Sequence, residues 1–229
     1  MLGTIVNFIA IGLGGLAGLF FGKALPEKLK TTVIQGIGLS VIIIGIQMAA
    51  KTTNALIMIA SLAIGGLIGE SMDIEARLND FGSFLEKKLS PNGEGHFTKG
   101  FVTTSLIYCV GAMGIVGSLE DGLNGSHGIL FAKSALDGIT AIIFSSSMGA
   151  GVIFSAIPVL LYQGSISLFA RLLHSVLSDP VVLEMSAVGG LLIFGIGINM
   201  LGIKEIRVGN LLPGIFIAVP LTILCTHFG

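Results

Sequence analysis

Charged, aromatic and cysteine residues are all scarce in this sequence. Of its 229 residues, 11% are charged, whereas a soluble domain carries about 25%, so an ordinary soluble domain is excluded. A net charge of −1 excludes the strong positive field that would attract nucleic acid. Tryptophan is absent and tyrosine occurs twice, so no aromatic belt can mark a membrane interface. Cys109 and Cys225 lie inside apolar runs and are typical of small hydrophobic residues, not of a disulfide or metal framework.

The motifs of several enzyme classes are also missing. The sequence contains no HExxH, GxSxG, P-loop or CxxC pattern. Its four histidines are scattered without the spacing of metal ligands, and its acidic residues lack the spacing of a calcium-binding loop. We therefore expect no enzyme, no catalytic residue, no metal site and no cofactor.

What the sequence does have is long apolar runs. Hydrophobic residues make up 53% of the chain, glycine occurs 34 times, and the mean hydropathy is +0.97. Runs of about 20 apolar residues are long enough to cross a bilayer. They predict an all-α polytopic membrane protein with about seven to eight spanning helices, in contact with lipid. The first run has no basic segment before it, so we expect a retained helix rather than a signal peptide. The runs lie near 3–22, 32–50, 55–71, 99–118, 130–145, 148–175, 181–202 and 208–227.

One stretch between these runs is charged. Apolar residues recur every three or four positions from Ile74 to Leu89, with charges between them, which indicates an amphipathic helix lying along the interface; a loop follows at Pro91. With eight crossings, nine Lys and Arg residues fall on the side of this helix and three on the other. This bias places the helix in the cytoplasm and both termini outside, in a bacterial inner membrane.

The chain also carries a short internal similarity at an offset of 152 residues. GLSVIIIGIQM (38–48) and GLLIFGIGINM (190–200) are identical at six of eleven positions, and Gln47 aligns with Asn199. An odd offset in crossings would invert one copy, as in many secondary transporters; the alternative is chance similarity between apolar helices. Within one transmembrane domain (1–229) we predict a first helical unit (1–71), the cytoplasmic segment (72–97), central polar helices (98–150) and a second helical unit (151–229).

Polar residues in the central stretch provide the candidate site. Lys133 and Asp137 are four residues apart and share a helix face, with Ser134 beside them. Ionisable groups in a membrane are costly and are functional candidates by default. One interpretation is a charge-balanced ion or solute site that faces a cavity. The other is a self-neutralising pair that makes the helix tolerable to lipid.

The remaining candidates have alternatives as well. Glu120 and Asp121, in a glycine-rich turn with no compensating cation nearby, form either a cation-attracting outer mouth or a solvated loop. The run from Ser145 to Ser147 is either an unwound helix break or a tight hairpin. Amides in apolar helices either line a solute path or pair between helices; these are Gln47, Asn199, Gln163 and Asn7. Glu184 is interpreted as a helix N-terminus stabiliser.

Glycines at a spacing of four residues follow the first apolar run. Gly14, Gly18 and Gly22 form a small-residue ridge, which allows close approach of another helix. The ridge predicts helix packing, and it is also a candidate surface for a homodimer.

Several motifs resemble those of a known family. The matching segments are YCVGAMGIVGSLEDGL, FAKSALDGI, SAIPVLLYQGSI, LGIKEIRVGNLLP and the opening MLGTIVN. Together they resemble the YdfK-type bacterial membrane proteins, catalogued as domain-of-unknown-function family 554, over essentially the whole chain. The resemblance implies an inner-membrane protein, often described as a transporter, and it transfers no catalytic residue. We expect a small secondary transporter or ion-conducting protein for an unidentified solute. The alternative is a non-transporting scaffold or regulatory subunit that docks a partner through the cytoplasmic segment.

Overall fold

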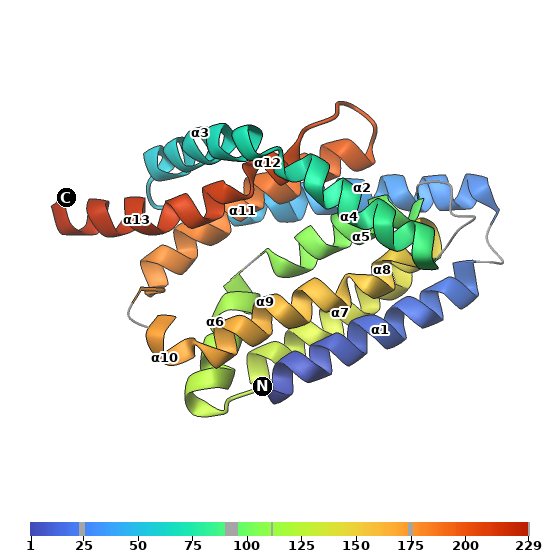
Figure 1. Ribbon diagram of the computed structural model, residues 1–229, viewed down its shortest axis with the longest axis horizontal. Helices are drawn as coiled ribbons and strands as arrows, with labels where there is room; N and C mark the ends of the chain where they lie inside the picture. The colour runs from blue at the N-terminus through green and yellow to red at the C-terminus, as the bar shows by residue number, and fades with distance from the viewer. Residues whose placement is uncertain (23–25, 90–95, 111, 174–175, 229) are drawn as a thin grey trace. The chain divides into compact units, whose positions relative to one another are not determined.

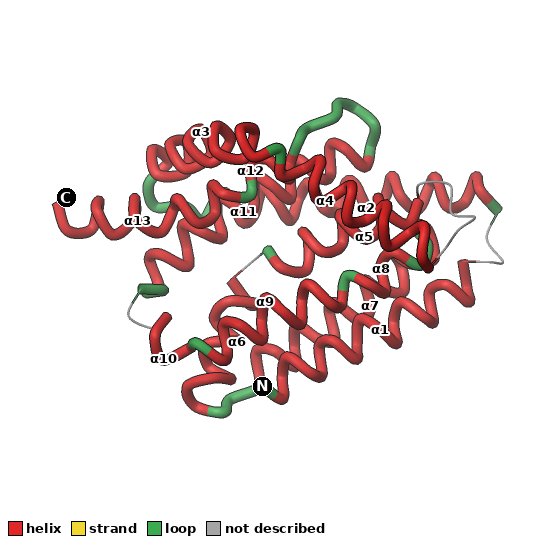
Figure 2. Tube along the Cα trace, in the orientation of Figure 1, coloured by secondary structure: helices red, strands yellow, loops and turns green. Residues whose placement is uncertain are grey.

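The computed structural model describes residues 1–22, 26–89, 96–110, 112–173 and 176–228. Within these ranges the chain forms thirteen helices and no strand (Figures 1 and 2). The predicted loop at Pro91 lies outside the described residues. In chain order the helices are α1 (Leu2–Gly22), α2 (Glu27–Ala49), α3 (Ala55–Met72), α4 (Ile74–Leu89), α5 (His96–Cys109), α6 (Ala112–Asn124), α7 (Gly128–Met148), α8 (Gly151–Phe154), α9 (Ala156–Leu168), α10 (Ala170–Leu173), α11 (Asp179–Met200), α12 (Val208–Leu211) and α13 (Pro213–Phe228).

Seven helical segments in the described part of the chain are long and apolar enough to cross a membrane. The all-α polytopic class is therefore confirmed. The pair α5 and α6, bent by 61°, makes an eighth candidate if both helices form one span. The seven segments are Leu2–Phe21, Thr31–Ala49, Ala55–Met72, Gly128–Met148, Gly151–Leu168, Asp179–Met200 and Val208–Thr226.

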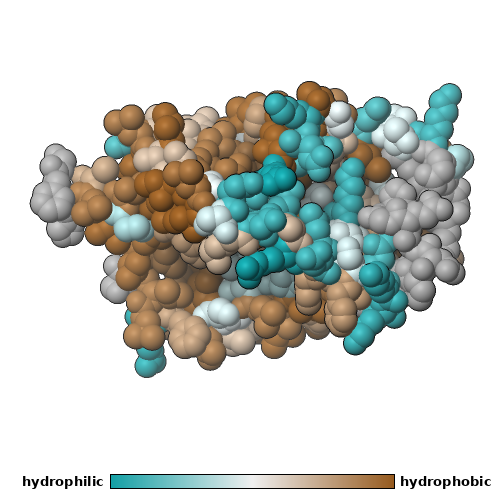
Figure 3. All heavy atoms as spheres, turned by 45° about the horizontal axis from the view of Figure 1, so that its top comes forward, coloured by the Kyte–Doolittle hydropathy of each residue, from teal (hydrophilic) through white to brown (hydrophobic). Residues whose placement is uncertain are grey.

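Large apolar side chains lie on the outside of these helices. Phe20 is 80% exposed, Leu67 is 76% exposed and Leu56 is 73% exposed. Apolar residues also cover much of the face seen in Figure 3. A soluble monomer rarely exposes so much contiguous apolar surface. These side chains are therefore the surface that contacts the lipid bilayer.

The chain divides into two compact units, which are described separately. Unit 1 comprises Met1–Ile34, Asn79–Cys109 and Met113–Arg171, and unit 2 comprises Gln35–Leu78, Val110–Ala112 and Leu172–Gly229. Each unit is thus assembled from segments distant in the sequence. The four-part division predicted from the sequence follows chain order instead, and it stays a prediction.

In unit 1, α1 packs along α7, with α9 also against it (Figure 1). Gly3 faces Leu130, Gly14 faces the Gly138 carbonyl, and Gly18 faces the Ile142 carbonyl. Because residue numbers rise together along the two helices in these contacts, α1 and α7 run parallel. The glycine ridge therefore packs against a helix of the same chain, as close approach requires. Gly22 is the last residue of α1 and its contacts are not described, and a homodimer through this ridge stays a prediction.

The serine run belongs to the end of α7. Ser145, Ser146 and Ser147 are all helical, and α7 ends at Gly149, whose φ of 81° favours glycine. The next candidate span begins at Gly151. A tight turn between two spans, the hairpin alternative, describes this region, three residues later than the sequence pattern placed it.

In unit 2, α11 is the most deeply buried span, and it contacts α3, α12 and α13. The α2–α11 contact is made through the glycines of the internal similarity. Gly45 lies against the Gly190 carbonyl, and Gly197 lies against the Gly38 carbonyl. The numbers run in opposite directions, so α2 and α11 are antiparallel.

The charged stretch forms α4, as the spacing predicts for a helix. The helix follows Asp73, which has a left-handed φ of 48° and donates its backbone N–H to the Glu70 carbonyl. In its unit 1 portion Glu86 is buried and accepts a hydrogen bond from the Thr98 hydroxyl at 2.7 Å. The buried face of α4 thus includes an acidic residue, which the predicted apolar face did not contain.

Candidate functional site

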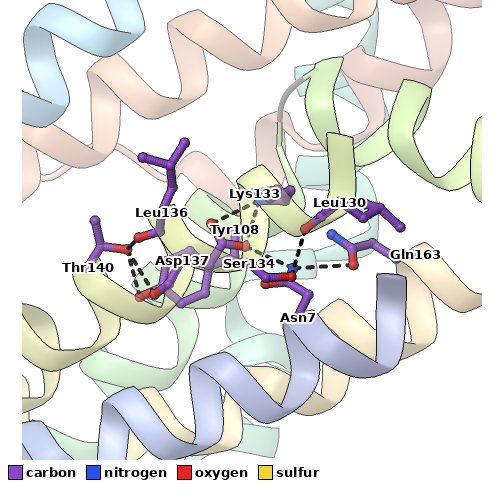
Figure 4. Close-up of polar contacts among 9 residues, drawn as sticks. All are labelled: Asn7, Tyr108, Leu130, Lys133, Ser134, Leu136, Asp137, Thr140 and Gln163. Carbon is purple, nitrogen blue, oxygen red and sulfur yellow. Dashed lines mark hydrogen bonds and ion pairs between the residues drawn. The ribbon is translucent and has the colours of Figure 1, made fainter. Parts of the chain in front are cut away.

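Polar side chains from three helices of unit 1 meet in one buried cluster. Lys133 Nζ lies 3.0 Å from Asp137 Oδ1 and 2.7 Å from Asp137 Oδ2. Asn7, from α1, donates its side-chain amide to Asp137 Oδ2 at 3.0 Å and to Gln163 Oε1, from α9, at 3.3 Å. Figure 4 shows the four side chains directed toward one another. We call Asn7, Lys133, Asp137 and Gln163 the polar cluster.

Helix geometry explains the positions of Lys133, Asp137 and Asn7. Lys133 and Asp137 are four residues apart on α7 and project from one face. The close contact of Gly14 with the Gly138 backbone brings α1 against this face, and Asn7 therefore reaches the carboxylate. Lys133 and Asp137 are 7% and 6% exposed, and Asn7 and Gln163 are fully buried. A lone charge at such a place would be very costly, so the ion pair makes both charges tolerable.

The carboxylate fixes the orientation of both amides. An ionised carboxylate only accepts hydrogen bonds, so Asn7 must present its nitrogen to Asp137. The same nitrogen faces Gln163, which must therefore present its oxygen. Asn7 Oδ1 and Gln163 Nε2 are left as a buried acceptor and a buried donor without a hydrogen-bond partner among the described residues. Thr4, one turn before Asn7 on α1, also has a buried and unpartnered hydroxyl in the described structure.

The hydroxyls beside the cluster bond elsewhere. Ser134 donates to the Leu130 carbonyl at 2.7 Å, and Thr140 donates to the Leu136 carbonyl at 2.9 Å. The Tyr108 hydroxyl is 3.5 Å from that of Thr140. Of the three candidates predicted on α7, only the two charged residues thus face the amides, and Ser134 contacts the helix backbone.

The predicted outer mouth is helical. Glu120 and Asp121 lie in the last turns of α6 and not in a glycine-rich turn. Asp121 is buried, with its carboxylate 2.7 Å from the amino group of Met1 and 2.5 Å from His127 Nδ1. The expectation of no compensating cation nearby was therefore wrong, because the start of α1 lies against α6. Glu120 is partly exposed.

The repeat-related amides belong to unit 2 and bond differently from each other. Asn199 donates to the Ile206 carbonyl and accepts from the Ile206 N–H, both at 2.8 Å, which closes the loop after α11. Gln47 is exposed on α2. These contacts give Asn199 a structural role, and a solute-lining role for the two amides stays a prediction.

Glu184, interpreted from the sequence as a helix N-terminus stabiliser, is a buried carboxylate of unit 2. Glu184 is 1% exposed on α11 and binds the loop between α2 and α3. Its oxygens accept from the Thr52 hydroxyl at 2.6 Å, the Thr53 N–H at 2.7 Å, the Thr53 hydroxyl at 2.9 Å and the Asn54 N–H at 3.3 Å. All these donors are neutral. Glu184 thus holds the loop between α2 and α3 against α11, a role that goes beyond stabilising the N-terminus of its own helix.

A polar corner joins α3, α4 and α12 in the same unit. Glu70 accepts from Arg207 at 2.6 Å and from the Asn210 side chain at 2.7 Å. Glu75 accepts from the Gly209 N–H at 2.9 Å, and its own N–H donates to Asn210 Oδ1 at 2.7 Å. These bonds hold the start of α4 against α12.

Possible metal ligands do not gather in the described part of the chain, and the hollow found in unit 2 is largely apolar. Among the residues described, no group of three His, Cys, Asp or Glu side chains could hold a metal ion. Unit 2 has an open hollow of about 460 Å³ between α2, α3 and α11, whose lining includes Ile46, Met58 and Phe194 and no ionisable residue. The polar cluster is therefore the strongest candidate site in the described structure.

Comparison with known proteins assigns the family. Residues 2–223 match the family described as "Protein of unknown function (DUF554)". The chain belongs to this family. A relative described as uncharacterized membrane protein YdfK, from Bacillus subtilis (strain 168), is 33% identical over 231 residues, covering 99% of this chain and 97% of the relative. The uncharacterized protein YqgA of Escherichia coli (strain K12) is 33% identical over 227 residues, covering 97% and 96%. No solved structure matches. The resemblance to the YdfK-type family is thus confirmed, while the family's description assigns no activity.

Proposed function

We propose that this member of the DUF554 family is a small secondary transporter or ion-conducting protein of the bacterial inner membrane, and that the polar cluster is its solute site. The observation that carries the proposal is a Lys–Asp pair and two amides from three helices, buried within a protein of apolar spans. Ionisable groups at such a position commonly mark the path of an ion or solute.

A scaffold or regulatory subunit is the competing function, and one observation favours it. Lys133 contacts both oxygens of Asp137, so the pair satisfies itself as a purely structural pair would. A scaffold does not explain why Asn7 and Gln163 each retain a buried polar atom without a partner among the described residues. Buried polar atoms without a partner are costly and call for an explanation, and a solute that bonds them supplies one. We therefore prefer transport.

Two features of the helix packing support the expected transporter architecture. Because α1 and α7 are parallel, both cross the membrane in the same direction. With α1, α2 and α3 as three successive crossings, one more crossing is needed between α3 and α7. The pair α5 and α6 supplies it if the two helices cross together, and this supports eight crossings. The glycine contacts support the inverted repeat. At the repeat offset of 152 residues, Gly38 corresponds to Gly190 and Gly45 corresponds to Gly197. The contact of Gly38 with Gly197 therefore corresponds to the contact of Gly190 with Gly45, as a two-fold axis between the copies would generate.

The test is flux through the purified protein in liposomes. Vesicles loaded with a pH-sensitive dye report proton entry under a potassium-valinomycin potential, and radiolabelled sodium, acetate, acetamide and acetamidinium report the other probes. We expect wild type to carry at least one probe faster than protein-free vesicles, and Asp137→Asn to abolish that flux because the substitution removes the charge that holds Lys133.

The matched control is Ser165→Ala on α9, where the hydroxyl is exposed and bonds only the Leu161 carbonyl among the contacts described. This variant should carry the probe as wild type does. Undiminished flux in folded Asp137→Asn would remove the cluster from the mechanism. Absence of flux for every probe in wild type would favour the scaffold.

A further inference from the structure

The polar cluster has a direction, set by its charges. Lys133 donates to Asp137, Asn7 also donates to Asp137, and Asn7 donates onward to Gln163. Reversing either amide would place nitrogen against nitrogen or oxygen against the carboxylate, so the chain of bonds has one orientation. Its free ends are consequently the side-chain oxygen of Asn7 and the NH₂ group of Gln163.

The two free ends exclude charged guests by their chemistry. A carboxylate or phosphate offers only acceptors, so it would bond Gln163 Nε2 and leave the Asn7 oxygen facing a negative charge. An ammonium or metal cation would bond the Asn7 oxygen and face the Gln163 N–H, and Lys133 already neutralises Asp137. An uncharged group with a donor and an acceptor on neighbouring atoms satisfies both ends.

The surroundings also leave some room. A methyl group added at Gly114 would meet Lys133 Cε at 3.7 Å and the Tyr162 ring at 3.8 Å, which are ordinary contact distances. The position of Gly114 therefore has room for one methyl group, in contact with Lys133 and Tyr162. The Thr4 hydroxyl, which can donate or accept, is a third group without a partner among the described residues.

We propose that Asn7 and Gln163 bind a small uncharged solute that carries a donor and an acceptor side by side, as a primary amide does. The proposal rests on the cluster being the solute site, and it names the class of solute. The ion pair is the positioning element: Asp137 orients Asn7, and Asn7 orients Gln163.

Three probes of nearly equal size and shape test this choice. Acetamide offers a donor and an acceptor, acetate offers acceptors only, and acetamidinium offers donors only. Binding to the full chain in phosphatidylcholine nanodiscs is measured by saturation-transfer NMR, which detects weak ligands. We expect a signal for acetamide about tenfold stronger than for either ion, since each ion leaves one buried group unpaired.

Two substitutions at Gln163 separate specificity from folding. Gln163→Leu removes the donor and should abolish the acetamide signal. Gln163→Glu keeps the shape but turns the free N–H into an acceptor, so acetamidinium should bind better than acetamide. A variant that merely misfolds cannot exchange one preference for another. Ser165→Ala serves again as the control and should retain the wild-type order.

A preference of wild type for acetate or acetamidinium, equal signals for all three probes, or no signal at all would overturn the proposal. The last outcome is the one expected if a single buried water bridges the two amides. These results stand apart from the flux test. Asp137-dependent flux of an ion without acetamide binding would preserve transport and reject the solute class, whereas acetamide binding without flux would do the reverse.

Discussion

Asp137 in unit 1 and Glu184 in unit 2 are both buried carboxylates on apolar helices, but their surroundings differ. Glu184 is satisfied by neutral hydroxyls and backbone N–H groups of one loop. Asp137 is satisfied by a lysine on its own helix and by an amide from α1. The neighbours of Glu184 are hydrogen-bonded, whereas Asn7 and Gln163 keep unpaired atoms within the described structure.

The difference separates a structural acid from a candidate site. A carboxylate that accepts from a loop is an anchor, and its removal should affect folding alone. A carboxylate such as Asp137 binds a cation and orients two amides. Each of these amides keeps a polar atom that is not hydrogen-bonded to any described part of the fold. Burial by itself therefore does not identify function in this protein. What distinguishes the two carboxylates is whether the groups around them are fully hydrogen-bonded.

The largest expected effect is the loss of the cation beside Asp137. Lys133→Met leaves an uncompensated buried carboxylate, which should destabilise the protein by about 3–5 kcal/mol and abolish flux. Circular dichroism in detergent at increasing temperature measures the stability, because the absence of tryptophan rules out its fluorescence.

The double variant Lys133→Met/Asp137→Leu sharpens this result. It removes both charges, so most of the lost stability should return while flux stays absent. If the single variant were as stable as wild type, the pair would not be buried as described, and the contrast with Glu184 would fail.

A smaller effect is expected at the anchor. Glu184→Gln keeps the shape but replaces one acceptor oxygen by an NH₂ group beside the α2–α3 loop, at a cost of about 1–3 kcal/mol. Flux and probe binding should stay at wild-type levels in whatever fraction is folded. Thermal unfolding and flux are measured on the same preparation. A loss of flux in a stable Glu184→Gln protein would break the distinction between the two carboxylates.

The smallest effect concerns Glu75, a half-buried carboxylate at the polar corner. Burial raises the pKa of Glu75 above 4.5, and the hydrogen bond from Gly209 opposes this. Glu205 raises the pKa further, while Arg207 lowers it. The native state therefore binds the proton more tightly than the unfolded chain does. The stability from this group is fully present below pH 4.5 and is lost as the pH rises through the folded-state pKa.

Glu75→Gln should abolish this dependence, since the amide does not titrate and its oxygen can still accept from Gly209. The melting temperature is followed from pH 4 to pH 7.5, and the wild type should lose more than the variant over that interval. Asp80→Asn, at an exposed position of α4, should behave as wild type. An identical slope in Glu75→Gln would exclude Glu75 as the cause.

Much of the architecture was predictable because it depends on local sequence. Apolar runs predicted the spans, and the spacing of Lys133 and Asp137 predicted their pairing on one face of α7. The contacts of Asn7 and Glu184 were not predictable. Their partners lie about 130 residues away in the chain, and a lone polar residue in an apolar helix has no local signal for what it will meet. Asp121 was misjudged for the same reason, because Met1 is close only in space.

The parallel packing of α1 on α7 also has a consequence for biosynthesis. Asn7 and Asp137 are 130 residues apart, and a ribosome adds about 5–20 residues each second, so roughly ten seconds separate the two. During that interval α1 is already made while the helix that covers its glycines is not. A nascent chain halted before α7 should thus leave α1 open to crosslinking by lipid or by the insertion machinery, and that reactivity should disappear once α7 has been made.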